Sequence, residues 1–143
     1  MIFNTKTQSI KLFDAWSFIH INTAMLLTYA LYPFFKYKTL YIVFFLTLLF
    51  ELIENSSFGI NAWKPLFPEY NGDSYLNIVG DLISNLIGIY IAYYLIHNTT
   101  SFTRSLYLIL LFLLLEFIPT YTSNLSILIT LTNHIQYLIN HIT

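Results

Sequence analysis

Apolar residues dominate five stretches of the chain, and polar residues gather between them. The pattern predicts four transmembrane helices at about 13–35, 39–55, 73–97 and 104–118. A fifth stretch, at about 125–139, is apolar but interrupted by polar residues, so it can either span a membrane or lie along its surface. The fold class expected from this pattern is all-α, a polytopic helical membrane bundle.

The segment from Ser56 to Gly72 separates the second and third predicted helices. Its glycines and prolines predict a structured loop, which can lie partly at the membrane interface. Either Asp73 or Ser74, which follow the loop, can cap the third helix.

Composition strengthens the membrane interpretation. Hydrophobic residues make up 57% of the 143 residues and charged residues only 9%, and the mean hydropathy is +0.65. A soluble domain has roughly 25% charged residues. We therefore expect one transmembrane domain over residues 1–143, located in a membrane as a multi-pass protein with membrane lipids as partners. The sequence leaves the oligomeric state open.

Charge and cysteine content exclude several function classes. The net charge is −1 and the six basic residues are scattered, which argues against a nucleic-acid partner. The chain has no cysteine, so thiolate metal sites and thiol nucleophiles are excluded. No convincing signal-peptide cleavage site is visible, and we expect the first apolar stretch to be a retained span.

The acidic residues are distributed unevenly across the predicted membrane. If the chain crosses at each helix, the N-terminus, the second–third loop and the fourth–fifth loop share one side. All but one of the seven acids then lie toward that side: Asp14, Glu51, Glu54, Asp73, Asp81 and Glu116. Basic residues are balanced between the two sides, so the positive-inside rule does not orient the chain.

Spacing within the helices aligns these acids with amide and hydroxyl groups. Residues three or four apart share a helix face. A charge at the bilayer centre costs at least about 2.5–3.5 kcal/mol, so such residues are expected to face the bundle interior. The residues predicted to line one cavity are Asp14, Ser17, His20, Glu51, Glu54, Asn55, Asp73, Ser74, Asn77, Asp81, Asn85 and Glu116.

Many acids with few nearby cations cannot all stay ionised in a low-dielectric cavity. Either several hold protons or a divalent cation neutralises them. Oxygen ligands with one imidazole suit Mg²⁺, Ca²⁺ or Mn²⁺, and the predicted metal ligands are Glu51, Glu54, Asp73 and Asp81. If the site is catalytic, Glu51, Glu54 or Asp81 would act as general base or metal ligand and His20 as proton shuttle.

Three functions stay open at this level. The cavity can bind a divalent cation or a lipid headgroup, relay protons or cations as part of a transporter or channel, or hold a structural bundle together. Asp14 and Asp73 can be simple helix caps, and Asn77 and Asn85 can be interhelical hydrogen-bonding groups. No known catalytic motif is present, so enzymatic activity is left undecided.

Three segments of the chain combine acidic, amide and hydroxyl residues: Phe13–His20, the central Phe50–Ser56 with Tyr70–Asp81, and Leu115–Glu116 with Asn124–Ser126. In these segments the chain resembles an uncharacterised family of small bacterial membrane proteins that is distantly similar to the VanZ-like proteins. The resemblance implies a helical membrane fold and supplies no activity. Where the family pattern carries arginines, this chain has Lys64 and Thr122-Ser123, so no phosphate-binding role follows from it.

Overall fold

The computed structural model describes residues 10–65, 67–101, 103, 106–108 and 110. The elements with described bounds are α2 (Ala15–Phe35), η1 (Lys36–Lys38, a short 3-10 turn), α3 (Thr39–Glu54), α4 (Ser57–Trp63) and α5 (Tyr75–Asn98). The described residues after α5 at 101, 103, 106–108 and 110 are also helical. No strand occurs within the described residues, so the all-helical prediction is confirmed there.

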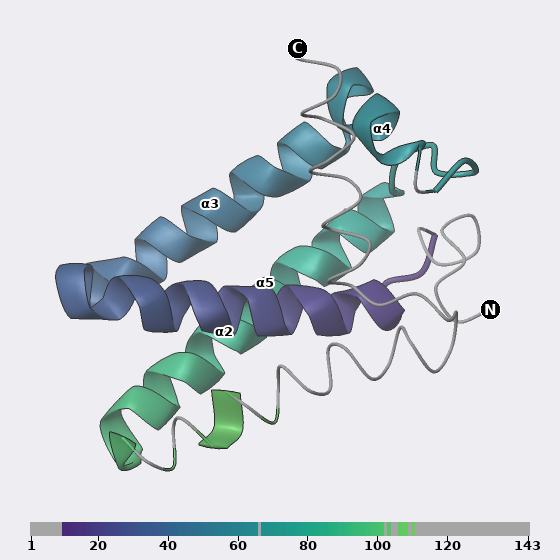
Figure 1. Cartoon of the computed structure of the whole chain (residues 1–143). Helices are drawn as coiled ribbons and strands as arrows, with labels where there is room; N and C mark the ends of the chain where they lie inside the picture. Colours follow the sequence, from purple (N-terminus) through teal and green to yellow (C-terminus); the bar gives the residue numbers. More distant parts are fainter. Residues whose placement is uncertain (1–9, 66, 102, 104–105, 109, 111–143) are drawn as a thin grey trace.

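The helices α2 and α3 form a hairpin joined by η1, and α2 packs across α5. Figure 1 shows α2 running across α5, and α3 returning from the η1 turn toward the end of the molecule where α4 and the start of α5 lie. The most extensive packing is between α2 and α5. As a result, the beginnings of α2 and α5 and the end of α3 lie at the same end of the bundle.

The predicted helix ranges agree with α2, α3 and α5 to within two residues at each end. The prediction that 56–72 is only a loop is wrong, because this segment contains the seven-residue helix α4. Ser56 caps α4 by accepting a hydrogen bond from the Gly59 N–H at 3.2 Å. The predicted helix at 104–118 is described only at 106–108 and 110, and the one at 125–139 lies outside the described residues.

Small residues at every fourth position of α5 allow α2 to approach closely. Gly80, Ser84, Gly88 and Ala92 are all buried on this face of α5. A Cβ atom on Gly80 would overlap the carbonyl oxygen of Leu12, and one on Gly88 would overlap that of Ile21. Small residues four apart are a common means of packing membrane helices backbone to backbone.

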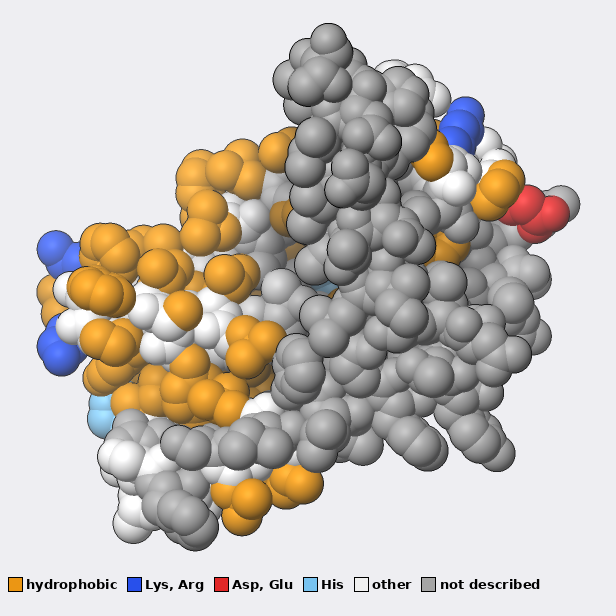
Figure 2. Space-filling view, in the orientation of Figure 1, with side chains coloured by type: hydrophobic (Ala, Val, Ile, Leu, Met, Phe, Trp, Pro, Cys, Tyr) orange, Lys and Arg blue, Asp and Glu red, His pale blue; other side chains and the backbone are white. Residues whose placement is uncertain are grey.

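The described residues bury polar side chains and expose large apolar ones. Buried polar groups include Asn22, Glu51 and Asn85, whereas Phe34 is 78% exposed and Tyr41 75% exposed. In Figure 2 hydrophobic side chains cover most of the described surface in view, with basic groups at one end and acidic and basic groups at the other. A small apolar core around Ala24, Val43 and Ile89 is also present, but this many enclosed polar groups beside this many exposed large apolar ones is unusual for a water-soluble domain.

One of the described helices, α5, is long and apolar enough to cross a membrane. The number rises to two if Ala15–Glu54 and Ser57–Trp63, which are bent by 78° relative to each other, are counted as one broken span. The described residues therefore do not confirm the predicted four spans, and the predicted fifth helix lies outside them.

Candidate functional site

The start of α2 is held by Asp14, which is the N-cap of the helix. Its Oδ1 accepts hydrogen bonds from the backbone N–H of Trp16 at 2.7 Å and of Ser17 at 3.0 Å. The Ser17 hydroxyl accepts one in return from the Asp14 N–H at 3.1 Å, which completes a capping box. Asp14 therefore has the capping role that the sequence allowed.

Two hydrogen bonds connect this cap to α5. The Ser17 hydroxyl donates to Oδ1 of Asp81 at 3.1 Å, and both side chains are buried. The Asn77 amide donates to the Lys11 carbonyl oxygen at 2.8 Å and lies 3.4 Å from Oδ2 of Asp14. Asp14, Ser17 and Asn77 thus fix the position of Asp81 relative to α2.

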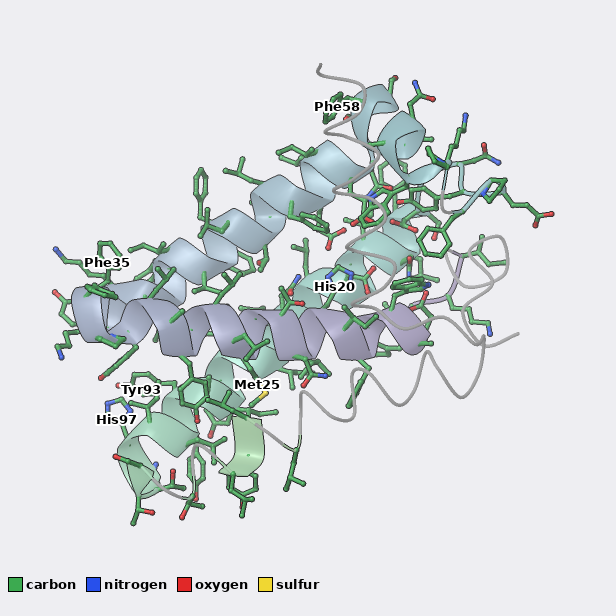
Figure 3. The ribbon with its side chains drawn as sticks, viewed as in Figure 1. His20, Met25, Phe35, Phe58, Tyr93 and His97 are labelled. Carbon is green, nitrogen blue, oxygen red and sulfur yellow. The ribbon has the colours of Figure 1, made fainter. Side chains whose placement is uncertain are left out.

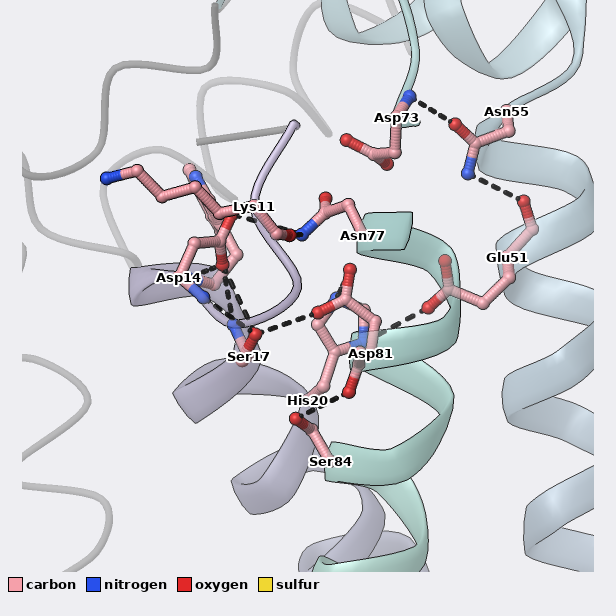
Figure 4. Close-up of polar contacts among 12 residues, drawn as sticks. Lys11, Asp14, Ser17, His20, Glu51, Asn55, Asp73, Asn77, Asp81 and Ser84 are labelled. Atoms are coloured by element: carbon pink, nitrogen blue, oxygen red, sulfur yellow. Dashed lines mark hydrogen bonds and ion pairs between the residues drawn. The ribbon is translucent and has the colours of Figure 1, made fainter. Parts of the chain in front are cut away.

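His20 lies between carboxylates from two other helices (Figure 4). Its Nδ1 is 3.3 Å from Oε1 of Glu51 on α3, and its Nε2 is 3.9 Å from Oδ2 of Asp81 on α5. Glu51 is 1% exposed, yet neither of its carboxylate oxygens accepts a hydrogen bond in the described part of the chain. A buried carboxylate without donors is costly unless a cation or a proton neutralises it.

The loop before α5 brings a third group of polar side chains to the same place. The Asp73 N–H donates to Oδ1 of Asn55 at 2.6 Å, and the Tyr70 hydroxyl donates to Oδ2 of Asp73 at 2.8 Å. Ser74, rather than Asp73, caps α5 by accepting from the Asn77 N–H at 3.2 Å. The Asp73 side chain is therefore available to the cavity.

Burial shapes the protonation of both loop residues. It raises the pKa of the Asp73 carboxyl above its ordinary value, against the opposing effect of the Tyr70 hydrogen bond. Burial, followed by the charges of Glu54 and Asp73, raises the pKa of the Tyr70 hydroxyl. Tyr70 therefore keeps its proton and remains a donor to Asp73.

These groups surround a polar cavity of about 60 Å³. Of the residues predicted to line it, five do so: His20, Glu54, Asp73, Asn77 and Asp81. The other lining residues are aromatic: Trp16, Trp63, Phe67 and Tyr70. Phe67 lies between the two indoles, with ring centroids 5.4 Å from Trp16 and 6.0 Å from Trp63.

Sequence reasoning missed this aromatic wall, because aromatic side chains are abundant and common at membrane interfaces. The signal that could have found it is local. Trp63, Phe67 and Tyr70 occur within eight residues of each other, immediately before Asp73.

A second, mainly apolar cavity of about 280 Å³ adjoins the first. Its lining side chains come from α2, α3, α4 and α5: Trp16, Ile19, His20, Thr23, Leu27, Leu46, Thr47, Phe50, Glu54, Trp63 and Asn85. Asn85, predicted in the polar cavity, lines this one instead. The two cavities share Trp16, His20, Glu54 and Trp63.

The remaining predicted residues that the structure describes line neither cavity. Glu51, predicted to line the cavity, is instead buried next to His20. Asp14, Ser17, Asn55 and Ser74 hold helix ends or lining residues through the contacts above. Glu116 lies outside the described residues. His97, on the other hand, belongs to the opposite end of the bundle, where its Nε2 is 2.9 Å from the Tyr32 hydroxyl (Figure 3).

Two sets of side chains could hold a metal ion, and they share Glu51. The inner set is His20, Glu51 and Asp81, and the outer set is Glu51, Glu54 and Asp73. Within each set the potential ligand atoms lie within 4.8 Å of one another. Oxygen ligands on opposite sides of a Ca²⁺ ion are separated by about 4.6–5.2 Å, because each bond is about 2.3–2.6 Å.

No lysine or arginine forms an ion pair with these acids among the described residues; His20 is the only basic partner found there. The cluster of carboxylates thus carries more negative than positive groups and can accept a cation. Comparison of the chain with protein-family models, with curated proteins and with solved structures finds no match.

Proposed function

We propose that this chain is a multi-pass membrane protein that binds a divalent cation through the inner set His20, Glu51 and Asp81. The observation that carries the proposal is Glu51, a 1% exposed carboxylate whose oxygens accept no hydrogen bond among the described residues. A cation placed between Glu51 and Asp81 would neutralise both carboxylates. It would thereby remove the cost of burying them.

The ligand types favour Mg²⁺, Ca²⁺ or Mn²⁺. Two carboxylates and one imidazole form a hard, mainly oxygen site, and water or a ligand oxygen can complete the coordination. His20 can bind the ion through one ring nitrogen while a carboxylate holds the other, the usual way in which a histidine ligand is oriented. Ser17 is not a ligand of the ion; its hydroxyl donates a hydrogen bond to Asp81 and so orients that carboxylate.

The membrane part of the proposal rests on burial and hydropathy together. α5 meets the length and hydropathy required of a span, and α2 with α3 and α4 meets them as a bent pair. Large apolar side chains are exposed along α2, α3 and α5 while charged and amide groups are enclosed between these helices. Lipid would cover the first group, and the bundle would shield the second. The resemblance to a VanZ-like family is part of the proposal and rests on the sequence segments alone.

The test is the melting temperature of the purified protein in detergent, with EDTA or with Mg²⁺, Ca²⁺ or Mn²⁺. A cation at about 100 times its Kd stabilises the folded state by about 2.7 kcal/mol, which corresponds to a rise in Tm of roughly 5–10 °C for a chain of this size. We expect that rise in the native chain. We expect none in Glu51→Gln or Asp81→Asn, because each variant lacks a ligand.

Glu69→Gln is the matched control, because Glu69 is an acid of the exposed loop that belongs to neither metal set. This variant should respond to cations as the native chain does. An equal response in Glu51→Gln, or no response to any cation in the native chain, would rule out the proposed ion site.

A further inference from the structure

The polar and apolar cavities are neighbours, since Trp16, His20, Glu54 and Trp63 line both. The polar cavity is lined by carboxylates and aromatic rings, and the adjoining one mainly by aliphatic and aromatic side chains. A ligand that occupies both must therefore carry a charged head and an apolar tail. Membrane amphiphiles have this composition.

The chemistry of the polar cavity selects a cationic head. Glu54, Asp73 and Asp81 contribute carboxylates to the wall, and no lysine or arginine is paired with them in the described part of the chain. The Glu54 carboxylate makes no hydrogen bond or ion pair among the described residues, so its oxygens are available to a donor. Trp16 and Trp63 offer indole rings, which attract cations through their π faces.

The size of the polar cavity selects the kind of cation. About 60 Å³ holds only a few water-sized groups, since each water needs at least about 10–15 Å³ by this type of measure. A primary ammonium fits this space and donates three hydrogen bonds, one for each available carboxylate. A quaternary ammonium is larger and donates none.

The apolar cavity has room for part of a hydrocarbon chain. An apolar cavity of about 150 Å³ in another protein is known to bind benzene, and the volume here is about 280 Å³. Ile19 and Leu27 line it from α2, and Leu46 and Phe50 line it from α3. A tail extending from the polar cavity would lie between these two helices.

We propose that the paired cavities bind a membrane amphiphile whose headgroup ends in a primary ammonium, with the ammonium among Glu54, Asp73 and Asp81 and the start of the tail between α2 and α3. This assignment adds a ligand class to the cavity of the proposed function. It uses Glu54 and Asp73 of the outer set together with Asp81 of the inner set, and it does not require the divalent cation. Both tests can therefore fail independently.

The chain contains two tryptophans, and both line the two cavities, so tryptophan fluorescence reports directly on occupancy. The experiment titrates dodecylammonium into protein in maltoside micelles with EDTA present. Dodecyltrimethylammonium and dodecanol serve as probes with the same tail and a different head. We expect a saturable change with dodecylammonium and binding at least about tenfold weaker for the other two, a difference of about 1.4 kcal/mol.

Two pairs of variants separate the head from the tail. Glu54→Gln should lower the affinity for dodecylammonium by about tenfold, whereas Glu69→Gln in the exposed loop should leave that affinity unchanged. Thr23→Phe, which places a ring in the apolar cavity, should lower the affinity for dodecylammonium and leave the affinity for ethylammonium unchanged. Ala30→Phe adds a ring at another exposed position of α2 that lines neither cavity, and it should change neither affinity.

The outcomes are decisive in both directions. Equal fluorescence responses to the three dodecyl probes, or the same affinity loss in Thr23→Phe and Ala30→Phe, would overturn the inference. Selective binding of dodecylammonium in EDTA, with no cation effect on Tm, would support this inference and reject the divalent-cation site. A cation effect on Tm without selective binding of dodecylammonium would support the divalent-cation site and overturn this inference.

Discussion

At the scale of single residues, Glu51 and Asp14 show two different uses of a carboxylate at a helix end. Asp14 accepts two backbone hydrogen bonds and stabilises the first turn of α2. Glu51 accepts none among the described residues and lies 3.3 Å from His20. The first arrangement stabilises the fold by itself, whereas the second stabilises it only when a proton or a cation is present.

Glu51→Gln is therefore expected to melt at or above the native chain when EDTA removes divalent cations. The substitution keeps the shape of the side chain and removes an uncompensated negative charge from a buried site, where an unsatisfied polar group costs about 1–3 kcal/mol. Thermal unfolding in detergent with EDTA measures this difference. A Tm well below that of the native chain would mean that the Glu51 charge stabilises the protein without an added cation.

Asp14 gives the opposite expectation, because its role is to cap α2. Asp14→Asn should retain nearly the full stability, since asparagine is an equally good N-cap residue. Asp14→Ala should lose about 0.5–2 kcal/mol. The same thermal unfolding compares the two, and both variants should keep the cation-induced rise in Tm. Loss of that rise in Asp14→Asn would indicate that Asp14 is an ion ligand as well.

At the scale of the elements, the site depends on how closely α2 and α5 pack. Gly80 and Gly88 let the two backbones approach, and this approach places Ser17 within hydrogen-bond distance of Asp81. Glycine is required at both positions by the space available, since any Cβ would overlap backbone atoms of the opposite segment. Backbone atoms cannot move aside as a flexible side chain can.

Gly88→Ala should consequently separate α2 from α5 and lower stability by at least the 1–3 kcal/mol typical of overpacking. The separation should also weaken cation binding, although Gly88 touches none of the ligands. Leu86→Ala is a suitable control, because Leu86 is 48% exposed on the same helix. If Gly88→Ala has the same melting temperature as Leu86→Ala, α2 and α5 do not approach each other as closely as described.

The sequence predicts α2, α3 and α5 well because each is a long apolar stretch ended by polar residues. It misses α4, because a seven-residue helix has too few turns to show periodicity and Gly59 and Pro65 indicate a loop. The meeting of His20, Glu51 and Asp81 is foreseen from their places along the helices. The aromatic wall brings Trp16 of α2 together with Trp63, Phe67 and Tyr70. The closeness of the last three along the chain is visible in the sequence, but their meeting with Trp16 depends on tertiary packing.

At the scale of the whole molecule, the described residues enclose many polar groups and expose many large apolar side chains, which is unusual for a protein in water. Polar groups such as Asn22, Glu51 and Asn85 are enclosed, and large apolar side chains are exposed on every long helix. In water this surface would cause aggregation. In the proposed membrane location, lipid would cover this surface and the enclosed polar groups would form the proposed site.

This interpretation makes a topological prediction. α3 has 16 residues and is therefore about 24 Å long at 1.5 Å per residue, with the η1 turn at one end and α4 at the other. If α2 and α3 both cross the membrane, Lys38 in the turn and Glu69 in the loop after α4 face opposite sides of it.

The chain has no cysteine, so Lys38→Cys and Glu69→Cys each introduce a unique thiol. In sealed vesicles of one orientation, a membrane-impermeant maleimide should label one of the two, and the other only after the vesicles are opened with detergent. Both positions are exposed, so inaccessibility within the fold does not explain a missing label. Labelling of both variants in sealed vesicles would mean that α3 lies along the surface or re-enters, and the acidic cavity would then open at the interface rather than within the membrane.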